Sequence, residues 1–411
     1  MSTSPTHPSA ADLAAATPEG RDRTVDALRA FSILVVVLGH WLMAAISRDA
    51  GGDLEIGNLL EIEPWARRLT WPLQIMPLFF LVGGYAGAAS WAAATRTATP
   101  YGTWLAARLR RLLAPVAVMV VVASAAIAVA EALGADGELA DDARGLLGLP
   151  LWFLAVYVAL VALTPAMVAA DRRLGVAAVA GLAVGSLVVD LLHRGAGLPL
   201  VGWGAFAFVW LLPGQLGVAW RSGRIRPTPA FGLGIAAAGL AGLIALTAWF
   251  DYGTSLVGAW GGDRSNTDPP SLAIVGAALL QIGLAWWARP ALARLVEGRR
   301  AWTVVIAANG IALTVFCWHL VAAAGLVLLA SAGLFPLPEP ATAGWWLLRP
   351  VWMVAGAALL APLVALFSPI ERRAISPFRP PGWRPSTPVA ALAAAAVIAA
   401  LTFIALHGLP G

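Results

Sequence analysis

Long apolar stretches separated by short polar segments occupy most of the chain. A helix of about 20 mostly apolar residues crosses a hydrocarbon core of about 30 Å. The sequence holds eleven stretches of this kind, and each predicts one transmembrane helix. They lie near residues 29–46, 73–94, 112–132, 150–170, 174–192, 204–220, 231–250, 272–288, 302–331, 345–367 and 389–407. The pattern therefore predicts an all-α fold, a polytopic membrane helix bundle with about 11 transmembrane helices.

The composition agrees with a membrane protein and excludes other classes. Hydrophobic residues make up 60% of the 411 residues and charged residues 12%, which is too apolar for a disordered chain. The single cysteine, Cys317, leaves no disulfide framework and no cysteine-based zinc site within the sequence. Neither a Walker-type phosphate loop nor a His-Glu-x-x-His motif is present. We therefore expect neither nucleotide hydrolysis nor metal catalysis.

Arginine supplies every positive charge of the basic side chains and is unevenly distributed between the predicted loops. With the N-terminus inside, the inner segments hold 20 Arg and 7 acidic residues, and the outer segments hold 7 Arg and 15 acidic residues. Cytoplasmic loops collect basic residues, so this partition predicts a cytoplasmic N-terminus and, with eleven spans, an outer C-terminus. It also explains the net charge of +5 without a nucleic-acid partner. Because an Ala-rich chain with Arg and no Lys is typical of a GC-rich genome, we expect a bacterial inner (plasma) membrane.

An ionisable residue inside a predicted span is costly and is therefore a functional hypothesis. His40 lies in the first span, eleven residues after Arg29. In a helix, eleven residues give about 16 Å of rise and about 20° of residual rotation, so both side chains share one face. Asp26 precedes Arg29 by three residues, a spacing that allows pairing. The imidazole can act as a general base or form a structural hydrogen bond to another helix, and the spacing leaves both interpretations open.

Five short segments together resemble one family of membrane enzymes. The first is the Arg-x10-His pair of Arg29 and His40. The others are Met76-Pro77-Leu78-Phe79-Phe80-Leu81-Val82-Gly83-Gly84-Tyr85, Arg108-Leu109-Arg110-Arg111, Leu151-Trp152-Phe153-Leu154 and Phe316-Cys317-Trp318-His319. Their order, spacing and predicted sides of the membrane resemble the integral membrane acyltransferase-3 family over roughly residues 21–370. Members of this family transfer acyl groups, often acetyl from acetyl-CoA, to hydroxyls of glycans, lipids or small molecules.

The resemblance implies a membrane-embedded O-acyltransferase that moves an acyl group, expected to be acetyl, from cytoplasmic acyl-CoA to a hydroxyl of a glycan, lipid or secondary metabolite. The CoA part of the donor would then be held by Arg29, Arg108 and Arg111, because guanidinium groups bind phosphates well. The enrichment of basic residues in cytoplasmic segments is an alternative explanation for arginines at these positions. His40 would serve as general base or acyl relay. His319 lies about seventeen residues into the span 302–331, hence in the outer half of the membrane if that helix is straight. It would share the site with His40 or form a structural hydrogen bond.

The chain divides into three expected parts. Residues 1–20 read as a disordered cytoplasmic tail, residues 21–370 as the membrane acyltransferase domain, and residues 371–411 as a cytoplasmic linker with an extra C-terminal helix beyond the family's ten-helix core. Four polar residues within spans are expected to face the bundle interior: Gln74, Gln215, Gln281 and Asn309. The alternative function is a secondary transporter of a small polar solute, because transporters also place ionisable residues at the midplane of a helix bundle.

Overall fold

Eleven long helices form the body of the molecule in the part of the chain that the computed structural model describes, residues 9–18, 20–48, 52, 54–134, 137–258, 263–375 and 385–410. Each is long and apolar enough to cross a membrane, α9 together with the turn Leu191–Gly195 that follows it and α10 together with the turn Pro199–Gly204 that precedes it, which confirms the predicted polytopic all-α bundle. The spanning helices are α2 (Arg23–Met43), α5 (Met76–Arg96), α6 (Tyr101–Ala132), α8 (Leu151–Leu174), α9 (Val176–Asp190), α10 (Ala205–Arg221), α11 (Pro229–Trp249), α12 (Leu272–Glu297), α14 (Ala312–Ser331), α15 (Ala343–Ile375) and α16 (Thr387–His407).

Shorter elements connect the spans. They are α1 (Ala10–Ala15), β1 (Ala44–Arg48), β2 (Leu54–Asn58), α3 (Leu59–Ile62), η1 (Pro64–Leu69), α4 (Thr70–Leu73), α7 (Gly137–Gly148), η2 (Leu191–Gly195), η3 (Pro199–Gly204) and α13 (Arg299–Gly310). β1 and β2 pair antiparallel and follow α2 directly. The first helix therefore ends at Met43, three residues before the predicted end of that span.

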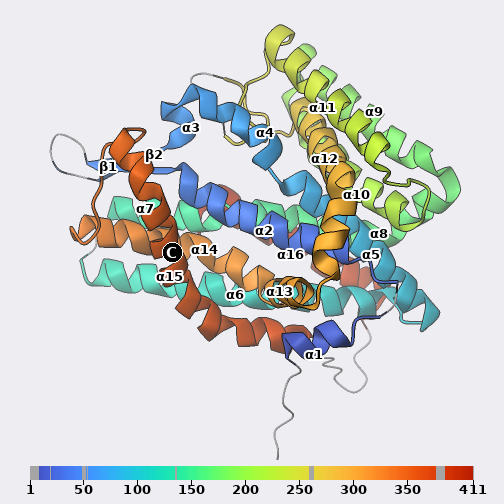
Figure 1. Cartoon of the computed structure of the whole chain (residues 1–411), viewed down its shortest axis with the longest axis horizontal. Coiled ribbons are helices and arrows are strands. Elements are labelled where there is room, and N and C mark those ends of the chain that lie inside the picture. Colours follow the sequence, from blue (N-terminus) through green and yellow to red (C-terminus); the bar gives the residue numbers. More distant parts are fainter. Residues whose placement is uncertain are drawn as a thin grey trace, which may run out of the picture.

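Figure 1 shows α2 crossing the middle of the bundle, with the β1–β2 hairpin beyond one of its ends. α2 packs against α5, α12, α14 and α15, so it contacts both sides of the bundle. α9, α10, α11 and α12 form one side, and α14 and α15 pack together on the other. The extra C-terminal helix α16 packs against α6 and α8. A residue in the middle of α2 is consequently surrounded by several other spans.

The apolar stretch 302–331 does not form one helix, which corrects the prediction. α13 ends at Gly310 and α14 begins at Ala312, because Ile311 leaves the helical conformation with φ −126° and ψ 6°. A break of this kind leaves backbone N–H groups without helical partners. The carboxylate of Glu371, on α15, accepts from the Thr314 backbone N at 2.9 Å and from Thr314 Oγ1 at 2.6 Å. A negative charge thus caps the start of α14, where the helix dipole favours it.

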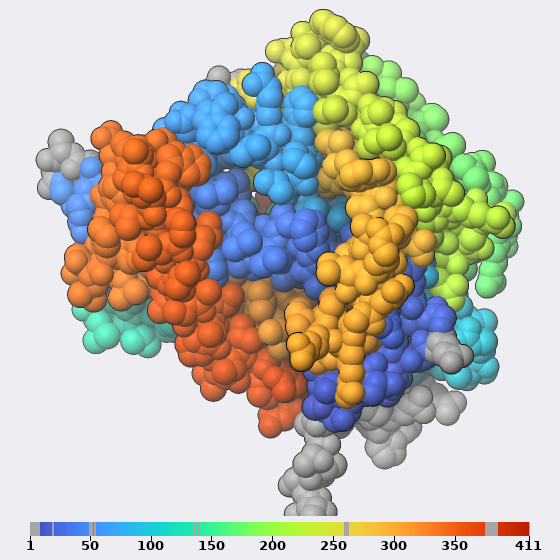
Figure 2. All heavy atoms as spheres, in the orientation of Figure 1, coloured from blue at the N-terminus to red at the C-terminus, as the bar shows by residue number. Residues whose placement is uncertain are grey.

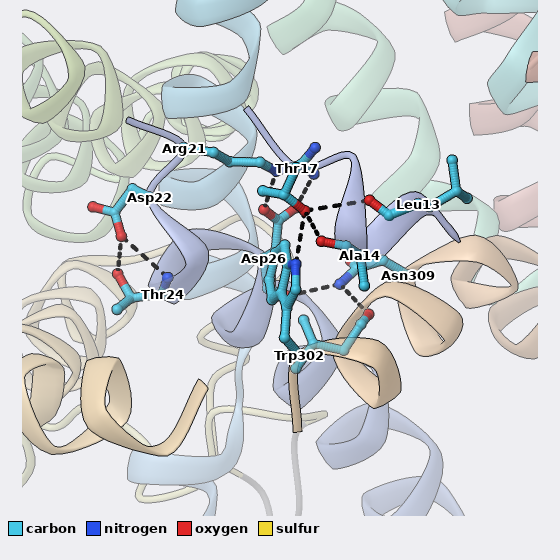
Figure 3. A network of polar contacts seen from close by, with 10 residues as sticks. Leu13, Ala14, Thr17, Arg21, Asp22, Thr24, Asp26, Trp302 and Asn309 are labelled. Atoms are coloured by element: carbon cyan, nitrogen blue, oxygen red, sulfur yellow. Dashed lines mark hydrogen bonds and ion pairs between the residues drawn. The ribbon is translucent and has the colours of Figure 1, made fainter. Parts of the chain in front are cut away.

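The segment expected to be a disordered tail contains a helix, and this too is a correction. Ser9 and Asp12 form a reciprocal capping box at the start of α1. After that helix, Thr17 Oγ1 accepts a hydrogen bond of 2.8 Å from Trp302 Nε1, which ties the segment to α13 (Figure 3). Residues 1–8 and 19 of the predicted tail lie outside the described residues.

Two glycines allow α5 and α10 to pack in direct backbone contact. A Cβ on Gly84 would lie 2.0 Å from the carbonyl oxygen of Gly214, and one on Gly217 would lie 2.0 Å from that of Leu81. Small residues at such crossings let membrane helices approach closely. This contact fixes α5, and with it the aromatic segment at its start.

Polar residues within the spans face inward, as predicted. Gln74, Gln215 and Gln281 are buried, and Gln281 Nε2 donates to the carbonyl oxygens of Trp71 at 2.8 Å and Gln74 at 2.9 Å. These bonds hold the irregular chain between η1 and α5 against α12. Asn309 Nδ2 donates to the Asp26 carbonyl oxygen at 2.8 Å and so joins α13 to α2.

Candidate active site

A pair of histidines lies inside the bundle. His40 of α2 and His319 of α14 are 2.8 Å apart between Nδ1 and Nε2, and their rings stack with centroids 5.0 Å apart. The side chain of His319 is completely buried, whereas His40 is half-buried. Because the chain breaks at Ile311, His319 is the eighth residue of α14 and lies level with His40. The sequence placed His319 about seventeen residues into one straight helix, whereas the break at Ile311 makes it the eighth residue of a separate helix, beside His40.

The hydrogen bonds around this pair determine which ring nitrogens carry protons. His319 Nδ1 lies 2.6 Å from the Phe316 carbonyl oxygen, which can only accept, so this nitrogen carries a proton. In a neutral ring, Nε2 of His319 is then an acceptor, and the proton of the 2.8 Å bond belongs to His40 Nδ1. The lone pair of His40 therefore lies on Nε2. Among the described residues, none forms a hydrogen bond to that atom, which leaves His40 Nε2 available as a base.

Neighbouring groups hold both histidines in place. The indole Nε1 of Trp41, the residue after His40, donates to the His319 carbonyl oxygen at 2.9 Å. Glu371 anchors the start of α14 through Thr314, as described above. The pair is thus positioned by three helices, α2, α14 and α15. Such rigid support is what a pre-organised reaction centre requires.

An aromatic wall, made of Phe79, Phe153, Tyr157 and Phe316, lies next to His319. Phe316 is 5.8 Å from His319 and 5.4 Å from Phe153 between ring centroids, and Phe153 is 5.0 Å from Phe79. Tyr157 continues the wall at 5.4 Å from Phe79. Three sequence segments noted for their aromatic residues, at the starts of α5 and α8 and within α14, thus meet at one place. Such packing excludes water from one side of the histidine pair.

The arginines predicted to bind CoA lie in the N-terminal parts of α2 and α6. Arg108 Nη1 donates to the Trp104 carbonyl oxygen at 3.1 Å, and its guanidinium lies 4.4 Å from the Trp104 ring centroid. Arg111 is exposed and lies near Arg29 and Glu371. Neither Arg29 nor Arg111 forms a hydrogen bond within the described part of the chain. Both guanidinium groups are therefore free to bind an anion.

Asp26 does not pair with Arg29, contrary to the pairing that its spacing allowed. It accepts two hydrogen bonds from Arg21, Nε to Oδ2 and Nη2 to Oδ1, each 2.8 Å long (Figure 3). The side-chain hydrogen bonds that Arg21 donates to Asp26 raise the pKa of Arg21, which lies before the first span. Since Arg21 satisfies this carboxylate, Arg29 keeps its charge available for another partner.

Two residues of the site were missed from the sequence. Glu371 precedes Arg372 and Arg373, so it resembled part of a cytoplasmic loop beyond the predicted span 345–367. α15 instead continues to Ile375 and buries this carboxylate. Tyr157 stood among apolar residues of its span and gave no signal of its own, yet it joins the aromatic wall. Its place became visible only when α5 and α8 were seen together.

The fold and the site together define a multi-pass membrane protein with an ionisable centre inside its helix bundle. A family model described as an acyltransferase domain matches residues 22–368, so the chain belongs to the acyltransferase-3 family. No curated protein and no solved structure matches the chain significantly. Family membership identifies a membrane acyltransferase and decides against the secondary transporter. The broken helix, a feature common in transporters, here places His319 beside His40.

Proposed function

We propose that the protein transfers an acyl group, acetyl in the simplest case, from cytoplasmic acyl-CoA to a hydroxyl of a glycan, lipid or secondary metabolite, with His40 as general base. The observation that carries this proposal is the hydrogen-bonded series from the Phe316 carbonyl through His319 to His40. This series leaves a lone pair on His40 Nε2, and a positioned imidazole of this kind suits proton abstraction from a hydroxyl.

The proposed step balances in protons and electrons. The acceptor hydroxyl oxygen attacks the thioester carbonyl carbon while His40 Nε2 takes the hydroxyl proton. The carbon–oxygen bond forms, the carbon–sulfur bond breaks, and His40 returns the proton to the CoA thiolate. His319 Nε2 accepts from His40 Nδ1 throughout and stabilises the imidazolium, so we assign His319 a positioning role. In the alternative mechanism with an acyl relay, the acyl group is first transferred from CoA to His40 Nε2 and then from His40 to the acceptor hydroxyl.

Arg29, Arg108 and Arg111 are proposed to hold the CoA end of the donor. Coenzyme A carries several phosphate groups, and guanidinium groups bind phosphate through paired hydrogen bonds. Two of these arginines lack hydrogen-bond partners among the described residues, which supports a ligand-binding role over a purely topological one. The aromatic wall, which runs from Tyr157 near the arginines to Phe316 at His319, offers an apolar side for the pantetheine arm.

The proposal places the protein in a bacterial inner membrane with its N-terminus in the cytoplasm. The partition of 20 Arg inside and 7 outside supports this orientation. Arg29 and Arg111 would then face the compartment that supplies acyl-CoA, while the β1–β2 hairpin at the other end of α2 would face the cell envelope. The lipid bilayer surrounds the bundle.

Acetyl transfer by membranes that contain the protein tests the proposal. Radiolabelled acetyl-CoA is supplied to the cytoplasmic face, and label is followed into lipid, glycan and soluble fractions. We expect label transfer by the wild type and a loss of about 10² to 10⁴ in rate for His40→Asn, since asparagine keeps a hydrogen bond but cannot take up the proton. His407→Asn is the matched control, because the His407 side chain, among the described residues, hydrogen-bonds only to the Phe403 carbonyl of its own helix, at 3.0 Å. Normal transfer by His40→Asn would refute the base role, and no acyl-CoA turnover by the wild type would refute the proposal.

A further inference from the structure

A large cavity opens at the end of α2 that lies away from the arginines. It measures about 830 Å³, is open to the outside, and is lined by β1, β2, α3, the end of α14 and the connection between α14 and α15. Figure 1 shows the hairpin beyond the end of α2, and in Figure 2 the start of α15, in orange, lies beside the blue segment that contains α3 and α4. Binding sites for small molecules usually measure about 300 to 1,000 Å³, so this cavity has the size of a ligand site.

The free charged groups of the cavity are carboxylates. Its charged lining residues are Glu55, Glu61, Glu339 and Arg48. Arg48 is already engaged, since its guanidinium donates to the carbonyl oxygens of Ala330 at 3.0 Å and Ser331 at 3.1 Å at the end of α14. The side chains of the three glutamates are exposed, and their carboxylates form no hydrogen bond or ion pair within the described part of the chain. Ionised carboxylates only accept hydrogen bonds, so this lining suits a ligand that donates O–H or N–H groups and repels an anion.

The cavity is close to the histidine pair. Ala45, which lines it, follows His40 by five residues, a path on the order of 10 Å along the chain. A second, water-sized cavity of about 10 Å³ lies next to it and shares Phe335 and Leu337 as lining residues. Arg349, which lines this smaller cavity, donates to the Ala44 carbonyl oxygen at 3.0 Å, directly after α2. Arg349 also donates to the Trp41 carbonyl oxygen at 3.4 Å, and the Trp41 indole donates to the His319 carbonyl oxygen, so hydrogen bonds connect this region with the histidine pair.

We infer that the cavity lined by Glu55, Glu61 and Glu339 binds the acyl acceptor, and that this acceptor is a hydroxyl-rich molecule, such as a sugar, without negative charge. The inference rests on the proposed function and adds to it the class of acceptor. Acyl-CoA and acceptor then approach His40 from opposite ends of α2. A neutral or amine-bearing sugar donates hydrogen bonds to the three carboxylates, and Phe335 provides an apolar surface for the face of its ring.

Binding of three small probes tests the inference without any acyl donor. Purified protein in lipid nanodiscs is titrated with methyl glucoside, glucosamine and glucuronic acid, which are neutral, cationic and anionic, and binding is measured by ligand-observed NMR. We expect the wild type to bind glucosamine best, methyl glucoside next and glucuronic acid at least about tenfold more weakly than glucosamine, because charge-assisted hydrogen bonds are the strong ones. The combined variant Glu55→Gln, Glu61→Gln and Glu339→Gln should bind glucosamine about tenfold more weakly and lose the discrimination against glucuronic acid.

The controls separate this inference from the proposed function. Asp142→Asn removes an exposed carboxylate of α7 that does not line the cavity and should bind all three probes like the wild type. His40→Asn should also bind them normally, since probe binding needs no general base. Retained acyl-CoA binding shows that the triple variant is folded. If glucuronic acid binds as tightly as glucosamine, if none of the probes binds, or if the triple variant matches the wild type, the inference is overturned even where acyl transfer is intact.

Discussion

Replacing His319 by leucine should slow acyl transfer without weakening acyl-CoA binding. In the proposed transition state His40 is an imidazolium, and His319 Nε2 accepts from its Nδ1 at 2.8 Å. A hydrogen bond to a charged group contributes about 1.5 to 3 kcal/mol, which corresponds to about 10- to 150-fold in rate. Leucine removes the acceptor and also frees the His40 ring to carry its proton on Nε2, where it hides the lone pair. We therefore expect kcat to decrease by a factor within this range or larger, while KM for acyl-CoA stays nearly unchanged.

Glutamine at position 319 provides the matched comparison. Its Oε1 can occupy the position of the histidine Nε2 and still accept from His40, so His319→Gln should retain more activity than His319→Leu. Cys317→Ala controls for packing, because Cys317 is buried in the same helix two residues away and forms no bond to either histidine. Steady-state kinetics on purified protein in nanodiscs, with CoA release as the readout, separates kcat from KM.

The magnitudes also define the result that would refute this reasoning. An average hydrogen bond between membrane helices is worth about 0.6 kcal/mol, or about threefold in rate. If His319→Leu loses no more than this factor, the histidine pair is an ordinary structural contact. Equal activities of the leucine and glutamine variants would likewise show that acceptance by position 319 is irrelevant to the reaction.

Two further predictions concern the arginines and the topology. Arg108→Ala and Arg111→Ala should each weaken acyl-CoA binding by about tenfold or more. Arg172→Ala is the control and should leave binding unchanged, because Arg172 is an exposed arginine of α8 on the same predicted side. Isothermal titration calorimetry on purified protein measures the three affinities. Equal affinity in all three variants would leave only the topological explanation. A reporter that is active only in the cytoplasm should be inactive when fused after Gly411, because eleven spans carry the chain to the outer side. Activity of that fusion would mean an even number of membrane crossings.

The sequence alone determined the number and the class of the spanning elements. Apolar length is a local property, and a bilayer requires it of every crossing helix, so eleven apolar stretches became eleven helices. The spacing of Arg29 and His40 is equally local, and both residues do lie on α2. The motif residues that suggested the acyltransferase-3 family could be recognised without any structure, and the family model agrees over residues 22–368.

The break at Ile311 has a local signal, the turn-favouring pair Asn309-Gly310, but the apolar stretch 302–331 continues on both sides of it, so apolar length alone predicted one helix. The break is stable because Glu371, 57 residues further along the chain, satisfies the freed N–H of Thr314. The position of His319 along the bundle, and hence its contact with His40, depends on that distant carboxylate. Asp26 shows the same limit, since the partner it takes, Arg21, is decided by how the N-terminal segment packs and not by helical spacing.

The chemistry of the site therefore belongs to the tertiary structure. His40 and His319 are separated by 279 residues, and only the packing of α14 against α2 brings their ring nitrogens within 2.8 Å. The protonation of the pair follows from that contact and from the Phe316 carbonyl, neither of which a local pattern contains. The cavity beyond α2 likewise combines a hairpin near residue 50 with a connection near residue 335. Local sequence determines which segments enter the membrane, whereas contacts between distant segments decide which of their side chains can react.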